Sequence, residues 1–150
     1  MKTLILLIPC LASVVFAVDS EEDRGAKLNR DAPAAASPTK TSDVISYGAE
    51  IEIAEYVALG KVTIVDFYAN WCGPCRLVSP PLERLAQTDS EIALRKIDIV
   101  NWGSPVAMQY HVNVLPQVNV YNRKGALTCS VRGVDVESIQ RCVAQAKSGG

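Results

Sequence analysis

Apolar residues along the second half of the chain follow strand-like and helix-like spacings in turn. Residues 62–69 form an uninterrupted β-favouring run, which is typical of a strand covered on both faces. Residues 71–87 place apolar side chains at helical spacing, and Pro80 and Pro81 are expected to kink that helix. A further strand is predicted over residues 92–99. This part of the chain is therefore expected to fold as strand, helix, strand.

The rest of the pattern adds a short helix, a hairpin and a last helix. Ser104 and Pro105 are expected to open a helix that ends near Tyr110. Residues 112–121 and 126–131 are extended and alternating, which predicts an antiparallel hairpin. The last helix should begin at Asp135 as its cap and carry an apolar stripe of Val136, Ile139, Cys142, Val143 and Ala146.

Two short segments ahead of the first strong strand are also β-favouring. Val44–Tyr47 and Glu50–Ile53 are predicted to pair as a small extra hairpin around Gly48. With this addition, the predicted fold class is α/β: a central mixed sheet of four to five strands flanked by helices, in the order βαβ then ββα.

The first 17 residues predict a signal peptide. Lys2 precedes the apolar run Leu4–Ile8, which continues with interruptions to Val18 and is too short to span a bilayer. Val15-Phe16-Ala17 fits a signal-peptidase site, so cleavage is expected after Ala17. Lipidation at Cys10 and retention as an uncleaved anchor remain alternatives. We expect export, with a bacterial periplasm or cell envelope as the preferred location and secretion as the other.

The composition of the remaining chain indicates its domain bounds and narrows the classes of partner. Residues 18–43 are rich in acids, Ala, Ser, Thr, Lys and Pro and predict a flexible linker, which leaves one domain over residues 44–147. The 15 lysines and arginines balance 16 acids, so no net charge favours nucleic acid as a partner. We expect a monomer, because no long dimerisation element is visible.

The chemistry centres on two cysteines at the predicted strand-to-helix junction. Cys72 is expected at the helix N-terminus, where the thiolate is favoured, and is predicted to be the nucleophile. Cys75 lies one turn deeper and is predicted to be the resolving thiol. The alternatives are a structural disulfide or half of a zinc site. Zinc needs four ligands, and Cys129, Cys142 and His111 offer no second closely spaced pair, so no metal is expected.

The segment VDFYANWCGPCR, residues 65–76, resembles the active-site segment of the thioredoxin family. The resemblance extends over about residues 44–147 and implies a thioredoxin fold. It also implies a thiol-disulfide oxidoreductase whose redox group is the Cys72–Cys75 disulfide, with no other cofactor. Asp66, unexpected in an apolar strand, matches the family's buried acid, which assists proton transfer at the second cysteine.

The resemblance also assigns the substrate side of the site. Leu115-Pro116 matches the family's cis-proline, which faces the cysteines while the preceding residue's backbone bonds the substrate. Pro80 matches the proline that kinks the helix. The residues that the resemblance places against the substrate are Trp71, Gly73, Pro74, Leu115, Pro116 and Gly133.

Three departures from the family pattern bear on substrate choice. Tyr68 replaces a common tryptophan, Gln117 replaces the threonine after the cis-proline, and the leader exports the domain. The leading extra hairpin, with Gly60-Lys61-Val62 entering the central strand, is similar to exported TlpA/ResA-like members, which reduce particular protein disulfides. Glycine and proline between the cysteines favour the reducing direction. The expected partners are protein disulfide or dithiol substrates and a membrane or soluble thiol electron donor. An oxidase or isomerase, and a binding module without turnover, are the alternatives.

Four other residues have simpler interpretations. Cys129 and Cys142 fall on predicted core faces and are interpreted first as buried thiols. In an oxidising compartment they could instead pair as a structural disulfide, or one could be an extra redox thiol. Trp102 is interpreted first as a packing residue, with a rim contact as the alternative, and His111 as a surface or packing residue.

Overall fold

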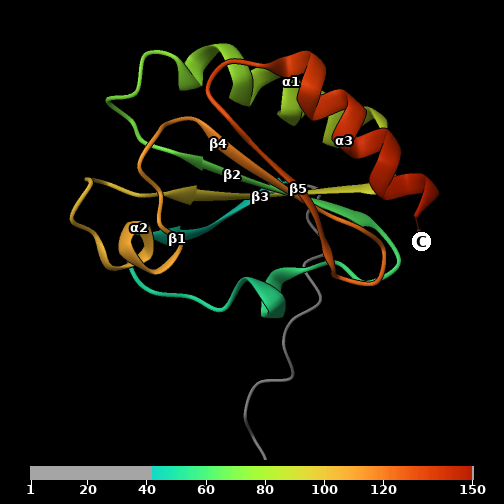
Figure 1. Ribbon diagram of the computed structural model, residues 1–150, viewed down its shortest axis with the longest axis horizontal. Coiled ribbons are helices and arrows are strands. Elements are labelled where there is room, and N and C mark those ends of the chain that lie inside the picture. The colour runs from blue at the N-terminus through green and yellow to red at the C-terminus, as the bar shows by residue number, and fades with distance from the viewer. Residues whose placement is uncertain (1–41, 150) are drawn as a thin grey trace, which may run out of the picture. The chain divides into compact units, whose positions relative to one another are not determined.

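A computed structural model describes residues 42–149 (Figure 1). The predicted signal peptide lies outside the described residues, as does the linker up to residue 41. The elements, in chain order, are β1 (Ser42–Tyr47), a short 3-10 helix η1 (Ile53–Tyr56), β2 (Val62–Tyr68), α1 (Cys75–Thr88), β3 (Ile92–Asp98), α2 (Pro105–Gln109), β4 (Gln117–Tyr121), β5 (Leu127–Arg132) and α3 (Val136–Ser148).

The strands form one mixed five-stranded sheet in the order β1-β3-β2-β4-β5. β1, β3 and β2 run parallel, whereas β4 runs antiparallel to both β2 and β5. α1 and α3 cover one face of this sheet, and α2 and η1 lie against the other (Figure 1). The predicted fold class, including the β4–β5 hairpin, is confirmed.

The central strand β2 has a different core on each face. Val62 and Ile64 pack with the apolar residues of α1 and α3, while Val65 and Phe67 pack with those of α2 and η1. Successive side chains of a strand point to opposite faces, so Asp66 lies on the same face as Ile64, beneath α1. The sheet therefore places the one acid of this strand under the helix that carries Cys75.

The predicted hairpin of residues 44–47 and 50–53 is wrong. β1 pairs in parallel with β3, and the chain after it forms no strand before η1. The physical reason lies in the hydrogen bonds of this segment. The Tyr110 hydroxyl donates to the Ile51 carbonyl and accepts from the Ile53 N–H, which ties the segment to the end of α2 instead of to β1.

With one exception, the described α-helices begin at a capping side chain. Asp135 caps α3 by accepting a hydrogen bond from the Ser138 N–H at 2.9 Å, as predicted. Ser104 likewise caps α2. The exception is α1, which begins at Cys75 and not at residue 71, because residues 71–74 form turns ahead of the helix. Cys72 therefore lies immediately before the first turn of α1.

Candidate functional site

Cys72 and Cys75 form a disulfide at the N-terminal end of α1, with 5.4 Å between their Cα atoms. Both side chains are buried in this oxidised form. The Cys75 backbone N–H donates to Cys72 Sγ, with 3.1 Å between nitrogen and sulfur. A donor of this kind, together with the helix dipole, stabilises negative charge on that sulfur. The geometry thus favours a thiolate on Cys72 when the pair is reduced.

Asp66 lies beneath α1 with no exposed surface. The Ser79 hydroxyl, from α1, donates to Asp66 Oδ2 at 2.6 Å. Burial raises the pKa of Asp66 to about 6, although the Ser79 hydrogen bond and the positive charge of Lys96 act in the opposite direction. A carboxyl group with this pKa can both accept and release a proton near neutral pH.

A hollow of about 340 Å³ opens beside the disulfide, between α1, the end of β2 with the loop that follows it, and Lys96 of β3. Both cysteines line it, together with Ser79, Glu83 and Lys96. The Lys96 ammonium pairs with the Glu83 carboxylate at 2.5 Å and lies 4.6 Å from the centre of the Tyr68 ring. The charged groups of Lys96 and Glu83, which lie near Asp66, are therefore held by their ion pair.

The expected cis peptide bond is present between Leu115 and Pro116. Leu115 packs against the apolar cluster that contains both cysteines. The Gly133 N–H donates to the Pro116 carbonyl at 2.8 Å, so Gly133 lies beside the same turn. Gln117, which follows the proline, is buried and accepts a hydrogen bond from Arg132 on β5 at 3.3 Å.

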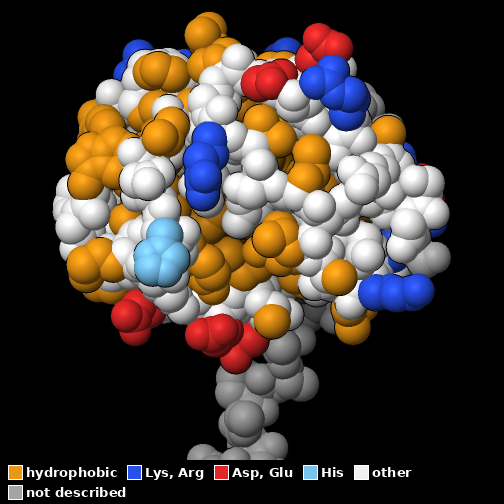
Figure 2. All heavy atoms as spheres, in the orientation of Figure 1, with side chains coloured by type: hydrophobic (Ala, Val, Ile, Leu, Met, Phe, Trp, Pro, Cys, Tyr) orange, Lys and Arg blue, Asp and Glu red, His pale blue; other side chains and the backbone are white. Residues whose placement is uncertain are grey.

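Two tryptophans form an exposed rim near the cysteines. The side chains of Trp71 and Trp102 are 53% and 48% exposed, and their ring centres lie 5.4 Å apart. The Trp71 indole N–H donates to the Val100 carbonyl at 2.6 Å. The packing interpretation of Trp102 is wrong, because the loop after β3 presents this ring to solvent beside Trp71. Apolar side chains gather at the left edge of Figure 2, where Figure 1 shows the loops that follow β2 and β3.

Asp98 was not predicted as a site residue, yet it connects the two loops of this rim. Its carboxylate is 2% exposed and accepts hydrogen bonds from the Asn70 side chain at 2.9 Å and from the Val100 N–H at 2.8 Å. Because parallel strands end at the same edge of a sheet, an acid that closes one apolar strand lies near the residues that follow its neighbour. That position in the sequence was the available signal.

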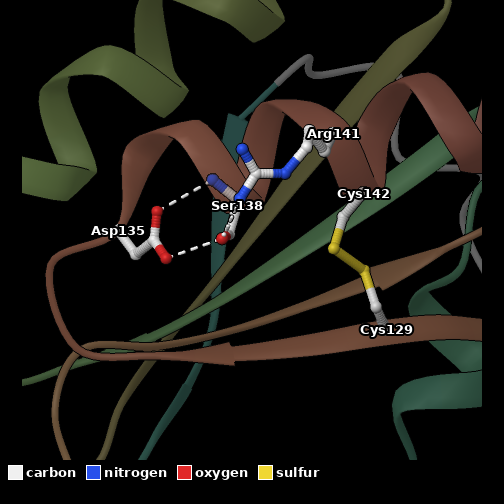
Figure 3. Close-up of a disulfide and its surroundings, with 5 residues drawn as sticks. All are labelled: Cys129, Asp135, Ser138, Arg141 and Cys142. Atoms are coloured by element: carbon white, nitrogen blue, oxygen red, sulfur yellow. Dashed lines mark hydrogen bonds between the residues drawn. A yellow bond between two sulfur atoms is a disulfide. The ribbon is translucent and has the colours of Figure 1, made fainter.

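Cys129 and Cys142 form a second disulfide, which joins β5 to α3 (Figure 3). Their interpretation as buried unpaired thiols is wrong. α3 packs directly on β5, and the Cα atoms are 6.1 Å apart, a separation that a disulfide can bridge. Ser138 and Arg141 lie on α3 near this bond, with the cap residue Asp135 at the start of the helix (Figure 3).

Residues 42–149 contain neither a candidate metal site nor a candidate membrane-spanning helix. No group of three or more His, Cys, Asp or Glu side chains in this range could hold a metal ion, and His111 is exposed. None of the described helices has the length and apolar character needed to cross a membrane. Cys10, the site of the alternative lipidation, lies outside the described residues.

Comparisons with known proteins match the part of the chain that carries this geometry. The family model described as "Thioredoxin" matches residues 49–145. Thioredoxin-1 of Saccharomyces cerevisiae is 29% identical over 93 residues, which cover 62% of this chain and 88% of that protein. A peptide-N(4)-(N-acetyl-beta-glucosaminyl)asparagine amidase of Caenorhabditis briggsae is 34% identical over 88 residues, but this chain spans only 14% of its length.

A solved structure agrees with the same assignment. The thioredoxin of Fasciola hepatica is 29% identical, with a TM-score of 0.51, over 59% of this chain and 84% of that structure. The matched residues 49–145 contain Asp66, both site cysteines, Pro116 and Gly133.

Proposed function

This chain belongs to the thioredoxin family, and from that premise we propose that it is an exported reductase of protein disulfides. Thioredoxins are thiol-disulfide oxidoreductases that act on protein disulfides through an active-site disulfide, here Cys72–Cys75. Export, the reducing direction and the roles of single residues are the proposed parts. The observation that carries the roles of the two cysteines is the hydrogen bond from the Cys75 N–H to Cys72 Sγ, next to the hollow lined by both cysteines.

The reaction begins from the reduced pair. The Cys72 thiolate attacks one sulfur of the substrate disulfide; the substrate S–S bond breaks, its other sulfur leaves as a thiolate and takes a proton, and a mixed disulfide forms at Cys72. Cys75 then loses its proton and attacks Cys72 Sγ. The mixed disulfide breaks, the second substrate thiol is released, and the Cys72–Cys75 bond closes. Two electrons have passed to the substrate.

Asp66 is the proposed base for the second step. The Cys75 thiol must lose a proton before it attacks, and a carboxyl group with a pKa of about 6 is suited to accept it near neutral pH. The substrate is proposed to lie along the Leu115 backbone beside Pro116, in contact with Trp71, Gly73, Pro74 and Gly133. The side chain of Leu115, which packs in the cluster of the two cysteines, supports this placement.

The reducing direction rests on the residues between the cysteines and on the relatives. Gly73 and Pro74 separate the pair, as in thioredoxins, whose reduction potential is about −270 mV against about −120 mV for the oxidase DsbA. An oxidised pair must then be recharged, and a membrane or soluble thiol donor is the proposed source of electrons. An oxidase or isomerase remains the alternative of the same chemistry.

Export is supported by the leader and by the second disulfide. Residues 1–17 have the pattern of a signal peptide, and structural disulfides such as Cys129–Cys142 persist in oxidising compartments. We therefore propose a bacterial periplasm or cell envelope, or secretion. Intact-mass analysis of the protein isolated from its native cells should find a chain that begins at Val18, with Cys129 and Cys142 oxidised. A chain that keeps residues 1–17 and four free thiols in the domain would contradict export.

The separate roles proposed for Cys72 and Cys75 are tested by trapping mixed disulfides with substrate proteins. Cys75→Ser should accumulate mixed disulfides with substrate proteins, because the bond formed by Cys72 can no longer be resolved. The matched control is the double variant Cys72→Ser/Cys75→Ser, which should trap nothing and reduce nothing. Non-reducing gels followed by mass spectrometry identify the trapped species. Equal trapping by the double variant, or none by Cys75→Ser, would remove the assignment of Cys72 as the nucleophile.

A further inference from the structure

We propose that Ser79 is a positioning residue for the reaction: its hydroxyl fixes the Asp66 carboxylate and carries protons between it and the hollow that Cys75 lines. The inference rests on the proposed function, because it takes Asp66 as the base for Cys75. It adds a residue that neither the sequence motif nor the family assignment identifies. The observations that carry it are the burial of Asp66, the lining of the hollow and one short hydrogen bond.

Asp66 has no direct access to the hollow. Its side chain is fully buried, and it is not among the residues that line the space beside the disulfide. Ser79 is 9% exposed, lines that space, and donates to Asp66 Oδ2 at 2.6 Å. Within residues 42–149, Asp66 Oδ1 has no hydrogen-bond partner. The Ser79 hydroxyl is thus the polar contact of this carboxylate, and it stands between the carboxylate and the hollow.

Ser79 lies one helical turn after Cys75 on α1. They lie four residues apart on α1, so their side chains are neighbours on one face of the helix. Both line the same hollow and both are buried. A proton that leaves Cys75 can therefore reach Ser79 through solvent in the hollow without crossing apolar core.

The Ser79 hydrogen bond is directed at Asp66 and not at the helix. A serine inside a helix commonly bonds the backbone carbonyl one turn earlier, which would use the hydroxyl for local structure. Thr88, on the same helix, makes such bonds to the carbonyls of Arg84 and Leu85. Ser79 instead joins α1 to β2 through the carboxylate, across 13 positions of sequence.

The charged groups around Asp66 come from two elements. Lys96 on β3 is the cross-strand neighbour of Asp66, and Glu83 on α1 pairs with Lys96. On the other side, β4 places the apolar Val118 opposite Asp66. Lys96 and Glu83 change the electrostatic potential at the carboxylate, and Lys96 is held by its ion pair with Glu83. Direct contact with the carboxylate is made by the Ser79 hydroxyl.

The proton transfer balances without any other reagent. When Cys75 attacks the mixed disulfide, its proton passes through solvent in the hollow to the Ser79 oxygen, and the Ser79 hydroxyl proton passes to Asp66 Oδ2. The serine ends with one proton, as it began, and the carboxylate becomes a carboxylic acid. The reverse sequence returns the proton to solvent before the next turnover. No electrons move in either step.

The test is a single-turnover measurement on the reduced protein with oxidised glutathione as the substrate. Samples are quenched in acid, and intact mass separates the glutathione mixed disulfide from the closed Cys72–Cys75 form. At pH 5, Ser79→Ala should slow resolution of the mixed disulfide about tenfold, and at pH 7 about twofold, because a hydrogen bond lost from a charged carboxylate raises its pKa by about one unit and so lowers the ionised fraction of Asp66. The pH at which the rate is half-maximal should also rise by about one unit.

Two variants distinguish this role from a structural one. Ser79→Thr keeps a hydroxyl and should restore most of the rate, while Thr88→Ala removes a hydroxyl from the same helix and should leave the pH profile unchanged. Ser79→Ala should still fold, because alanine is the better helix former. The titration of the Asp66 carboxyl, followed by carbon NMR, should move upward in Ser79→Ala and remain in place in Thr88→Ala.

The possible results distinguish the proposed role of Ser79 from the proposed function of the protein. If the wild-type protein resolves the mixed disulfide and Ser79→Ala has the same rate and pH midpoint, the role of Ser79 is wrong while the proposed function stands. Equally slow resolution by Ser79→Thr would also overturn it, since the hydroxyl would then be irrelevant. If the wild-type protein forms no mixed disulfide at all, the proposed function fails and this inference with it.

Discussion

Asp66 is an ionisable residue in the core, and its burial lowers the stability of the folded protein at neutral pH. Burial raises its pKa from 3.8 to about 6, so the folded state holds this proton more tightly than the unfolded chain does. Between these two values the folded protein binds more protons, and its stability therefore falls as the pH rises from about 4 to above 6. A residue that weakens the fold at neutral pH but lies beneath the active-site helix is best explained by the role proposed for it, as the base for Cys75.

Replacing Asp66 with Asn should therefore stabilise the domain at pH 8. The pKa difference of about two units corresponds to about 3 kcal/mol, at roughly 1.4 kcal/mol per unit, as an upper limit for the gain. The gain should shrink as the pH falls through 6 and vanish near pH 4. Urea unfolding at several pH values measures it. A gain of the same size at pH 4 and pH 8 would show that ionisation of Asp66 is not its cause.

The exposed tryptophans are expected to serve contact with protein substrates. A half-exposed indole is a frequent anchor of protein interfaces, and both tryptophans of the chain lie on this one rim. Trp102→Ala should slow the reduction of a protein disulfide several-fold while leaving the rate with dithiobis-nitrobenzoate almost unchanged. Leu59→Ala, at another exposed apolar residue ahead of β2, is the matched control. Equal losses of rate with both substrates would show that Trp102 affects the reactivity of the cysteines and not the contact with a protein substrate.

At the scale of the elements, the second disulfide fastens the edge of the sheet. β5 is the last strand of the sheet and is paired on one side only, by β4. The Cys129–Cys142 bond ties it to α3 across a sequence separation of 13. A cross-link of this kind restricts the unfolded chain, which is the main source of its stabilising effect in the loop-closure account.

Loss of this bond should lower the free energy of unfolding by about 3 kcal/mol, the loop-closure value for a loop of this size. Cys129→Ser, Cys142→Ser and the double variant should all lose nearly the same amount, because each breaks one and the same bond. Activity towards small disulfides should persist in all three. Denaturant unfolding without reductant checks the prediction, and losses that add up between the single variants would contradict it.

The elements that could be predicted are those specified by local pattern. β2, β3 and α3 follow from apolar spacing and capping, and the role of the Cys72–Cys75 pair follows from its spacing at a strand-to-helix junction. The pairing of β1 could not be predicted, because its partner β3 lies about 50 residues away and the local alternative, a hairpin, has an equally good β pattern.

The missed site residues share the same difficulty. Ser79 and Asp98 are ordinary polar residues of a helix and a strand end, and each acts on a group that is close only in the folded chain. The Cys129–Cys142 pair was left open for the same reason, since two cysteines on apolar faces fit a core as well as a disulfide. Spacing along one element is visible in a sequence, whereas contacts between elements depend on the register of the sheet.

At the scale of the whole molecule, the two disulfides have different surroundings and should behave differently. Cys72–Cys75 lies at a helix N-terminus beside a hollow open to solvent, with a buried acid nearby. Cys129–Cys142 joins β5 to α3 and packs against the core beneath that helix. The first is arranged to exchange electrons with a substrate and the second to hold the fold.

The central claim is that this domain is a reductase that works through Cys72 and Cys75, and the reduction potential of that pair tests it most directly. The mature domain is equilibrated with dithiothreitol buffers, and alkylation followed by peptide mass spectrometry reports each disulfide separately. For Cys72–Cys75 we expect a value close to the thioredoxin value of about −270 mV. A value near the DsbA potential of about −120 mV would contradict the reducing role and make the protein an oxidant.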